Sequence, residues 1–412
     1  MTSTDVRTGE GETFDPIGRH LPDPYPFLAA ARTEQPVFYS PVVGGWCVSR
    51  YDDIAAVVDD TDTFSSADAF PRPRNLPPEL EEWVQWFYVD APPLTFLDPP
   101  THTRVRRVIN RGFTPRALAA FEPDVREVTE RFVREVATRP EFDFVADLAA
   151  PLPLSVIMRV TGVPDSDTDR FRRWFEQSFI LVAASHTADE ATLIECGRGQ
   201  REWRAYITAM IDEREADPRD DLISFIVQRG VQEHRLSRDE IMTQIITMFA
   251  AGTETTANAL INLVYALLRQ PEHWAAVVAG TADLDRIIDE GLRLDTSVFG
   301  LYRTARRDVT IGGVDIPAGD MVFLLWGSAN RDESKYDDPL AFRPGRDRKA
   351  PDMTFGRGIH YCIGAPLARL QLRIALQALA AHLPGLHLAP DTPVRYRPIP
   401  QFRALESLIV RR

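Results

Sequence analysis

One short loop constrains this chain more than any other part of its sequence. The segment FGRGIHYCIG, residues 355–364, places Cys362 among three glycines and just before an apolar run. Glycine permits tight turns and close backbone approach, and Gly364 with Pro366 predicts a helix start. Helix N-termini favour a thiolate over a thiol. Because the segment 353–390 contains no aspartate or glutamate, we expect an anionic sulfur in this loop.

Four roles can be considered for Cys362. A buried structural cysteine is the default for an arbitrary cysteine. A thiol nucleophile needs a nearby base, and His360, two residues away on a turn, is poorly placed to act as one. A zinc site needs several ligands at short spacing, and the loop offers one cysteine and one histidine. A single thiolate ligand to haem iron needs one cysteine, small neighbours and an apolar lining.

Composition and charge narrow the class of protein. The chain has 412 residues, and its length alone suggests two or more domains. A net charge of −13 argues against general binding to nucleic acid or to a membrane surface. No apolar window is long enough for a membrane span, and the polar N-terminus is not a signal peptide. Three scattered cysteines, Cys47, Cys196 and Cys362, fit a reducing compartment. We therefore expect a soluble cytoplasmic protein.

The pattern along the chain predicts helices flanked by small sheets. Residues 1–13 are expected to form a disordered tail, and 14–412 one large domain that is mainly α with small β-sheets (α+β). Gly-Gly turns predict strand pairs around residues 44–45 and 312–313. Other expected features are a long loop over 69–83, helices over 114–270, a helix over 366–383 and short strands over the last 25 residues.

A second unusual stretch, AAGTETTAN at residues 250–258, lies inside a long helical pattern. Glycine and threonine are poorer helix formers than alanine, and glycine costs about 1 kcal/mol. Such a run fits small-residue packing against another helix. It also fits a functional weak point, where a side-chain hydroxyl interrupts the helical hydrogen bonds and holds water.

The spacing F-x-x-G-x-x-x-C-x-G, formed by Phe355, Gly358, Cys362 and Gly364, resembles the haem-ligand loop of the cytochrome P-450 monooxygenases. The resemblance implies that Cys362 is the axial ligand of haem b iron and that Phe355 packs beside its sulfur. It also implies one large helix-rich domain, with the haem between the helix carrying Ala251–Thr255 and the Cys362 loop. This overrides the suggestion of two domains from length.

The threonine-rich helix is similar to the oxygen-activation motif of that family, Ala251-Gly252-x-Glu254-Thr255. By resemblance, Thr255 stabilises dioxygen bound at the iron and Glu254 relays protons from bulk water. Many family members carry aspartate at the position of Glu254. Ala251 and Gly252 then lie against the cofactor.

Two further groups follow the family order. The pair Glu290 and Arg293 resembles the structural E-x-x-R pair, with Arg343 or Arg346 as expected partners from the meander. Buried haem propionates need cationic or hydrogen-bonding neighbours. The resemblance assigns this role to His102, Arg106, Arg303 and His360.

Partners and substrate complete the expectations. The chain shows no nicotinamide-binding GxGxxG fingerprint after a strand, so electrons would come from a small acidic ferredoxin and its NAD(P)H-dependent reductase, as in the soluble bacterial type. A docking patch is predicted from arginines at positions 104, 107, 111, 369 and 373. The substrate is expected to be a mid-sized apolar or aromatic molecule in a monomeric enzyme. By resemblance, it would be contacted by Trp86, Phe87, Phe179, Ala250, Phe299 and Phe402.

Three functions compete on this basis. The leading one is a partner-dependent monooxygenase that inserts one oxygen atom of O2. A hydrogen-peroxide-driven peroxygenase would not need the pair Glu254 and Thr255. A haem-binding sensor without turnover would have little use for that pair either.

Overall fold

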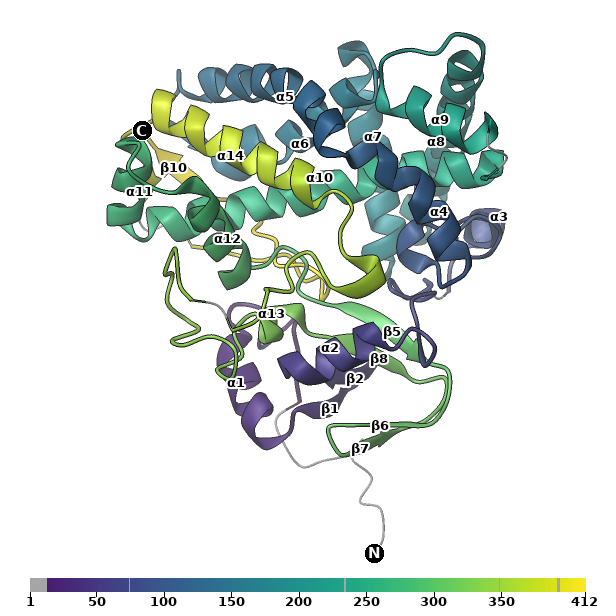
Figure 1. Ribbon diagram of the computed structural model, residues 1–412, viewed down its shortest axis with the longest axis horizontal. Helices are drawn as coiled ribbons and strands as arrows, with labels where there is room; N and C mark the ends of the chain where they lie inside the picture. Colours follow the sequence, from purple (N-terminus) through teal and green to yellow (C-terminus); the bar gives the residue numbers. More distant parts are fainter. Residues whose placement is uncertain (1–12, 74, 233–234, 348, 391–392) are drawn as a thin grey trace, which may run out of the picture.

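A helical half and a sheet half make up the protein (Figure 1). The computed structural model describes residues 13–73, 75–232, 235–347, 349–390 and 393–412. The predicted disordered tail lies outside these residues except for its last one, Thr13. Since that tail is not described, the division into a tail and one large domain stays a prediction.

Helices dominate the described residues, as the sequence predicts. In chain order they are α1 (Tyr25–Glu34), α2 (Tyr51–Asp59), α3 (Glu81–Gln85), α4 (Thr101–Ile109), α5 (Pro115–Val136), α6 (Pro151–Val160), α7 (Thr168–Ala183), α8 (Glu190–Ala216), α9 (Leu222–Gln232), α10 (Arg238–Leu268), α11 (Pro271–Val278), α12 (Leu284–Leu294), α13 (Trp326–Ala329) and α14 (Ala365–His382).

The central helix is α10, which contacts α6, α8, α12 and α14. It begins with a capping box, in which the Ser237 side chain accepts from the Glu240 backbone and the Glu240 side chain accepts from the Ser237 backbone. Because most of its residues are apolar and buried, α10 forms the spine of the main hydrophobic core.

The strands form three small sheets. They are β1 (Val37–Ser40), β2 (Gly45–Val48), β3 (Phe64–Ser65), β4 (Glu141–Asp143), β5 (Leu301–Ala305), β6 (Val309–Ile311), β7 (Val314–Ile316), β8 (Met321–Leu324), β9 (His387–Leu388) and β10 (Ile409–Arg411). The largest sheet has the order β1-β2-β8-β5-β3, and β2 runs parallel to β8 with Trp46 opposite Val322. The other two sheets are β4-β10-β9 and the hairpin β6-β7.

Both predicted Gly-Gly turns are confirmed. Gly44, with a φ of 72°, precedes β2 in the hairpin of β1 and β2. Gly312 and Gly313 have φ of 56° and 83° and join β6 to β7. Residues with a side chain rarely adopt these backbone dihedrals, which is why glycine is found there.

The long loop predicted over residues 69–83 ends earlier than expected. A 3-10 turn covers Pro78–Leu80, α3 follows, and a π-helical turn spans Trp86–Asp90. Acidic side chains in the first turn favour a helix N-terminus, and Trp83 is buried. Proline content alone therefore overestimated the length of the loop.

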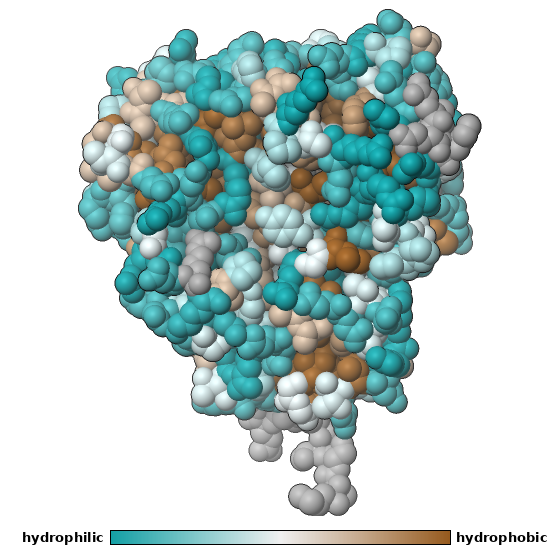
Figure 2. Space-filling model, in the orientation of Figure 1, coloured by the Kyte–Doolittle hydropathy of each residue, from teal (hydrophilic) through white to brown (hydrophobic). Residues whose placement is uncertain are grey.

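The face of the molecule shown in Figure 2 is mostly hydrophilic, with smaller apolar patches. Among the described residues, no helix has the length and apolarity that a bilayer crossing requires. The chain leading into α14 passes between the helical half and the sheet half (Figure 1). This passage contains the Cys362 loop.

Candidate cofactor site

The Cys362 loop is closed by its own backbone. Cys362 N–H donates to the Phe355 carbonyl at 2.8 Å, and Tyr361 N–H donates to the Gly358 carbonyl at 3.1 Å. Gly356 and Gly358 have φ of 71° and 65°, so two of the three glycines occupy the left-handed region. The loop thereby presents Cys362, which is exposed, just before α14 begins.

Opposing effects act on the Cys362 sulfur. Although the residue is exposed, desolvation by the protein atoms around its sulfur raises the pKa of the thiol, while the N–H groups of Gly364 and Ala365 and the charge of Arg106 lower it. The expected anionic sulfur therefore stays a prediction for the free side chain. A bound metal cation would remove the proton, because a coordinating thiol is deprotonated.

The donor set around Cys362 argues against zinc. Within the residues that the structure describes, no group of three or more His, Cys, Asp or Glu side chains could hold a metal ion. A site with a single protein sulfur instead suits a metal whose other ligands come from a macrocycle.

The middle of α10 offers an open face. Ala251 is exposed although Phe249 and Thr253 beside it are buried. A Cβ placed on Gly252 would meet no atom within 4 Å. These residues thus leave space for a flat ligand beside a helix that is otherwise packed.

The threonines do not interrupt α10, contrary to the predicted weak point. The Thr255 hydroxyl donates to the Ala251 carbonyl at 2.6 Å, and the Thr253 hydroxyl donates to the Phe249 carbonyl at 2.7 Å. The helix continues unbroken to Leu268. Each hydroxyl therefore shares a carbonyl of the preceding turn instead of replacing a helical bond.

Glu254 has a partner that the sequence did not indicate. Its Oε1 accepts from an Nη of Arg397 at 2.7 Å and from Nδ2 of Asn258 at 3.2 Å. Asn258 lies one helical turn further along α10. Arg397 is 143 residues away in sequence, so no local spacing could reveal it.

Two histidines and two arginines predicted to meet propionates are brought together. The rings of His102 and His360 have centroids 4.3 Å apart. Both ring nitrogens of His102 are buried and lack a hydrogen-bond partner in the described part of the chain. Arg303 is buried, and its one hydrogen bond within the described residues goes to the Tyr302 carbonyl.

Arg106 is used differently. Its guanidinium donates to the carbonyls of Ile359 and Tyr361 and so fastens α4 to the Cys362 loop. His360 also hydrogen-bonds Ser66, with Nε2 and Oγ 3.0 Å apart. These contacts position the loop beside His102.

The electrostatics of this group favour an anionic ligand. Burial, followed by the charge of Arg106, lowers the pKa of His102 to about 4. Burial, followed by the charge of Arg303, lowers the pKa of His360 to about 2. Burial also lowers the pKa of Arg303 to about 10, with Asp98 opposing. At neutral pH the two histidines are therefore uncharged hydrogen-bonding groups, and the Arg303 guanidinium supplies the positive charge. Together they fit the two carboxylates of haem b.

Glu290 and Arg293 form an ion cluster with Arg346, which is one of the two partners predicted from the meander. Glu290 Oε1 lies 2.8 Å from an Nη of Arg293 and 2.8 Å from Nε of Arg346, and the side chains of Glu290 and Arg293 are fully buried. Arg343 contributes its backbone N–H to Glu290 at 2.9 Å. Burial raises the pKa of Glu290, but hydrogen bonds from Arg293 outweigh this effect and hold that pKa below its usual range. This cluster is structural.

Three of the predicted substrate contacts share an aromatic row with two further phenylalanines. Ring centroids are 5.7 Å apart for Phe87 and Phe96, 6.3 Å for Phe96 and Phe70, 6.0 Å for Phe70 and Phe402, and 5.8 Å for Phe402 and Phe179. Phe70 and Phe96 were missed by the sequence reasoning, and the only signal for them was their aromatic type in the 69–96 segment.

The other three predicted contacts lie elsewhere. Trp86 touches Phe87, but the Arg204 guanidinium of α8 lies 4.3 Å from its ring centroid. Phe299 packs against Tyr25 in the N-terminal cluster, with ring centroids 6.2 Å apart. Ala250 is partly buried on α10. The role of all six in substrate binding stays a prediction.

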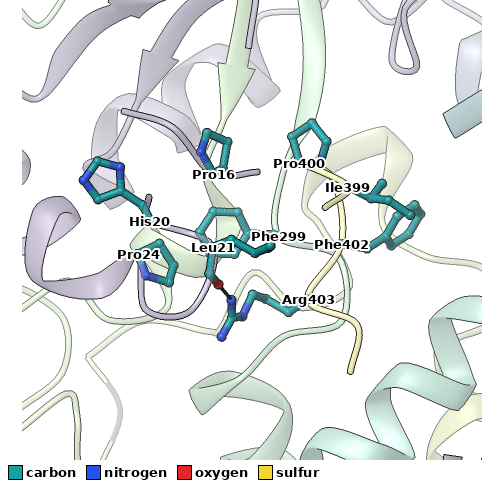
Figure 3. A pocket seen from close by; sticks show the side chains of 9 residues that line it. All are labelled: Pro16, His20, Leu21, Pro24, Phe299, Ile399, Pro400, Phe402 and Arg403. Carbon is teal, nitrogen blue, oxygen red and sulfur yellow. Dashed lines mark hydrogen bonds between the residues drawn. The ribbon is translucent and has the colours of Figure 1, made fainter. Parts of the chain in front are cut away.

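A small crevice is lined by both Phe299 and Phe402. It is lined by the segment containing Pro16 and Leu21 and by the C-terminal loop containing Ile399 and Phe402. Figure 3 shows the rings of Phe299 and Phe402 pointing in opposite directions, and Arg403 donating to the Leu21 carbonyl, at 2.5 Å. Phe402 contacts Phe70 and Phe179 of the aromatic row, whereas Phe299 contacts Tyr25.

Comparisons with known proteins extend over nearly the whole chain. The family model described as Cytochrome P450 matches residues 191–279 and 284–383. Cytochrome P450 130 of Mycobacterium tuberculosis (strain ATCC 25618 / H37Rv) is 34% identical over 375 residues, covering 89% of this chain and 90% of that protein. The biotin biosynthesis cytochrome P450 of Bacillus subtilis (strain 168) is 31% identical over 392 residues, covering 95% and 96%. A solved structure of cytochrome P450 CREJ in complex with (4-ethylphenyl) dihydrogen phosphate is 31% identical with a TM-score of 0.87, covering 98% of this chain and 99% of that chain.

Proposed function

The chain belongs to the cytochrome P450 family of haem-thiolate monooxygenases, and we propose that it oxidises a mid-sized apolar or aromatic molecule with electrons from a ferredoxin and its reductase. The observation that carries the site assignment is the pairing of two features. One is a single exposed cysteine on a closed loop, and the other is a buried cationic group with unpaired donors.

In this proposal the chain holds haem at three places. Cys362 supplies the sulfur ligand, His102 and Arg303 meet the propionates, and Gly252 leaves room for the macrocycle. When bound, haem supplies the redox chemistry that activates dioxygen. The protein contributes binding, orientation and proton handling.

Thr255 and Glu254 handle protons. Because the Thr255 hydroxyl hydrogen is directed at the Ala251 carbonyl, its Oγ1 presents lone pairs as an acceptor. Glu254 has Oε1 engaged by two donors, and Oε2 has no hydrogen-bond partner in the described residues. Oε2 is therefore the oxygen that can take a proton from water and pass it on.

The aromatic row supports an apolar or aromatic substrate. Its phenylalanines offer apolar ring faces and edges but no hydrogen-bond donor. The Arg397 guanidinium, which lies over the Phe179 ring, is neutralised by Glu254 in an ion pair at 2.7 Å. A strongly charged ligand would thus find no net counter-charge beside the row.

Ion pairs neutralise several arginines of the predicted ferredoxin patch. Arg104 pairs with Glu240 at 2.5 Å, Arg369 pairs with Asp289, and Arg373 pairs with Asp285. Arg107 is exposed on α4, one residue after the arginine that fastens the Cys362 loop. We therefore centre the docking site on Arg107, because charge reversal at Arg104 would also break its ion pair with Glu240.

Two measurements test the proposal. The dithionite-reduced protein with carbon monoxide should give a Soret band near ~450 nm, and Cys362→Ser should abolish it. A band near ~420 nm in fresh protein would overturn the thiolate assignment. With a [2Fe–2S] ferredoxin, its reductase and NADPH, the protein should form oxidised product from apolar probes. Product formed only with hydrogen peroxide would favour a peroxygenase.

The docking assignment has its own test. Arg107→Glu should slow ferredoxin-driven reduction and weaken its salt dependence. The matched control is Arg172→Glu on α7, since Arg172 is also exposed. Equal rates for the two variants would contradict the assignment.

A further inference from the structure

Arg397 lies between the proton-relay carboxylate and the aromatic row. One Nη contacts Glu254 Oε1 at 2.7 Å, and the guanidinium carbon lies 4.9 Å from the centroid of the Phe179 ring. The side chains of Arg397 and Glu254 are 37% and 13% exposed. A pair with one partner this buried is less screened than the ion pairs on the outer surface.

The loop that carries Arg397 is fastened to the molecule at other points. Arg397 N–H donates to the Ala404 carbonyl at 2.9 Å. Asn262 of α10 donates through Nδ2 to the Arg403 carbonyl at 3.1 Å. Because both ends of this turn are held, the Arg397 guanidinium has a defined position over α10.

The Glu254 side chain needs such an anchor. It is longer than the aspartate common at this position in the family, and each additional bond adds rotamers that burial must restrict. Within the described residues its anchors are Asn258 and Arg397, and both contact Oε1. With Oε1 held by two donors, Oε2 is the oxygen left to exchange protons.

The same loop carries Phe402, which contacts Phe179 and Phe70 in the aromatic row. Arg397 also covers Phe179. A molecule that packs on the row therefore touches the residues that support the Arg397 side chain. This arrangement connects the substrate contacts to the carboxylate.

We propose that Arg397 is a positioning residue that holds the Glu254 carboxylate in its proton-transferring orientation and links it to the aromatic row. The inference rests on the proposed function. Reduction of dioxygen by two electrons from the ferredoxin and two protons gives either hydrogen peroxide or, with a substrate, oxidised product and one water. Both outcomes draw protons through Glu254, so loss of its anchor slows either one.

The experiment uses the haem-loaded protein and requires no identified substrate. Arg397→Gln is compared with Arg395→Gln, because Arg395 is exposed on the same loop two residues earlier. Dioxygen consumption driven by a [2Fe–2S] ferredoxin, its reductase and NADPH is measured in H2O and in D2O. Arg397→Gln should slow consumption roughly 10-fold and raise the solvent isotope effect, since misplacement of a catalytic group can cost up to ~100-fold. Arg395→Gln should match the wild type.

A second readout is independent of turnover. The C–O stretching band of the reduced carbon monoxide complex responds to charges near the ligand, so Arg397→Gln should shift it and Arg395→Gln should not. Arg397→Lys should restore part of the rate, because it keeps a cation near Oε1. In a Glu254→Gln background, Arg397→Gln should have no further effect on rate.

The outcomes separate two failures. If the wild type lacks the ~450 nm band and consumes no dioxygen, the proposed function is wrong. If the wild type is active but Arg397→Gln behaves like Arg395→Gln in rate, isotope effect and stretching band, the positioning role alone is wrong. An additive effect of Arg397→Gln in the Glu254→Gln background would also overturn it.

Discussion

Two polar clusters in this protein each contain a buried arginine but differ in how that charge is balanced. In the ion cluster of Glu290, Arg293 and Arg346, the carboxylate accepts from both arginines, and Arg293 also donates to the carbonyls of Asn330 and Pro339. In the His–Arg cluster of His102, His360 and Arg303, the nitrogens of His102 have no partner in the described residues.

This difference in pairing distinguishes a buried polar group that supports the fold from one that binds a ligand. A buried charge is tolerated when its partners are protein groups, and then it serves the fold. Buried donors without partners are costly unless a ligand supplies the acceptors. The ion cluster is therefore expected to govern stability, and the His–Arg cluster is expected to govern retention of the cofactor.

Removing the carboxylate of the ion cluster should have the largest effect on stability. Glu290→Gln leaves Arg293 and Arg346 buried without a counter-charge, and breaking a buried pair costs about 3–5 kcal/mol. Urea unfolding of the haem-loaded protein measures the loss. Glu272→Gln is the control, since Glu272 is exposed at the start of α11. A loss below about 1 kcal/mol would mean that the cluster is not essential to the fold.

The ion cluster was predicted from the sequence through its resemblance to the family's E-x-x-R pair, and not from its spacing alone. Glu290 and Arg293 are three residues apart, a spacing that places both on one face of a helix. Such pairs are common on solvated helix faces, so the spacing needed the resemblance to become specific. The turn at Gly312–Gly313, in contrast, was predicted from two adjacent glycines alone.

Features that depend on distant contacts could not be predicted. Arg397 and Glu254 meet only because the C-terminal loop returns to α10, and nothing in the residues between them encodes that distance. The pairing of Arg104 with Glu240 joins α4 to the start of α10 across 136 residues. Charge patterns along a chain therefore overestimate unpaired charge, as the predicted docking patch did.

Removing a cation from the His–Arg cluster should have a smaller and qualitatively different effect. Arg303→Met takes away a buried guanidinium with one hydrogen bond in the described residues, so the chain itself should lose little stability. A hydrogen bond to a charged group contributes about 1.5–3 kcal/mol, so haem should be lost roughly 10- to 100-fold faster. Transfer of haem to excess apomyoglobin measures this rate.

The control for that variant is Arg307→Met, because Arg307 is exposed four residues further along the chain. It should leave the rate of haem loss unchanged. A variant at Arg303 that unfolds much more easily but keeps its haem would reverse the distinction between the two clusters.

The smallest effect is expected where α12 meets α14 at the surface. Asp285 and Arg373 form an ion pair there, with side chains 62% and 46% exposed, on the same helix that carries the fully buried Glu290. Exposed pairs contribute about 0–1 kcal/mol, and salt weakens them further. A double-mutant cycle of Asp285→Asn and Arg373→Gln, measured by urea unfolding at low and high salt, should give a coupling in that range that falls with salt. Because both ion groups extend from one helix, their chemistry is matched and burial is the variable that differs. A salt-independent coupling as large as the loss at Glu290 would show that burial does not decide which cluster supports the fold.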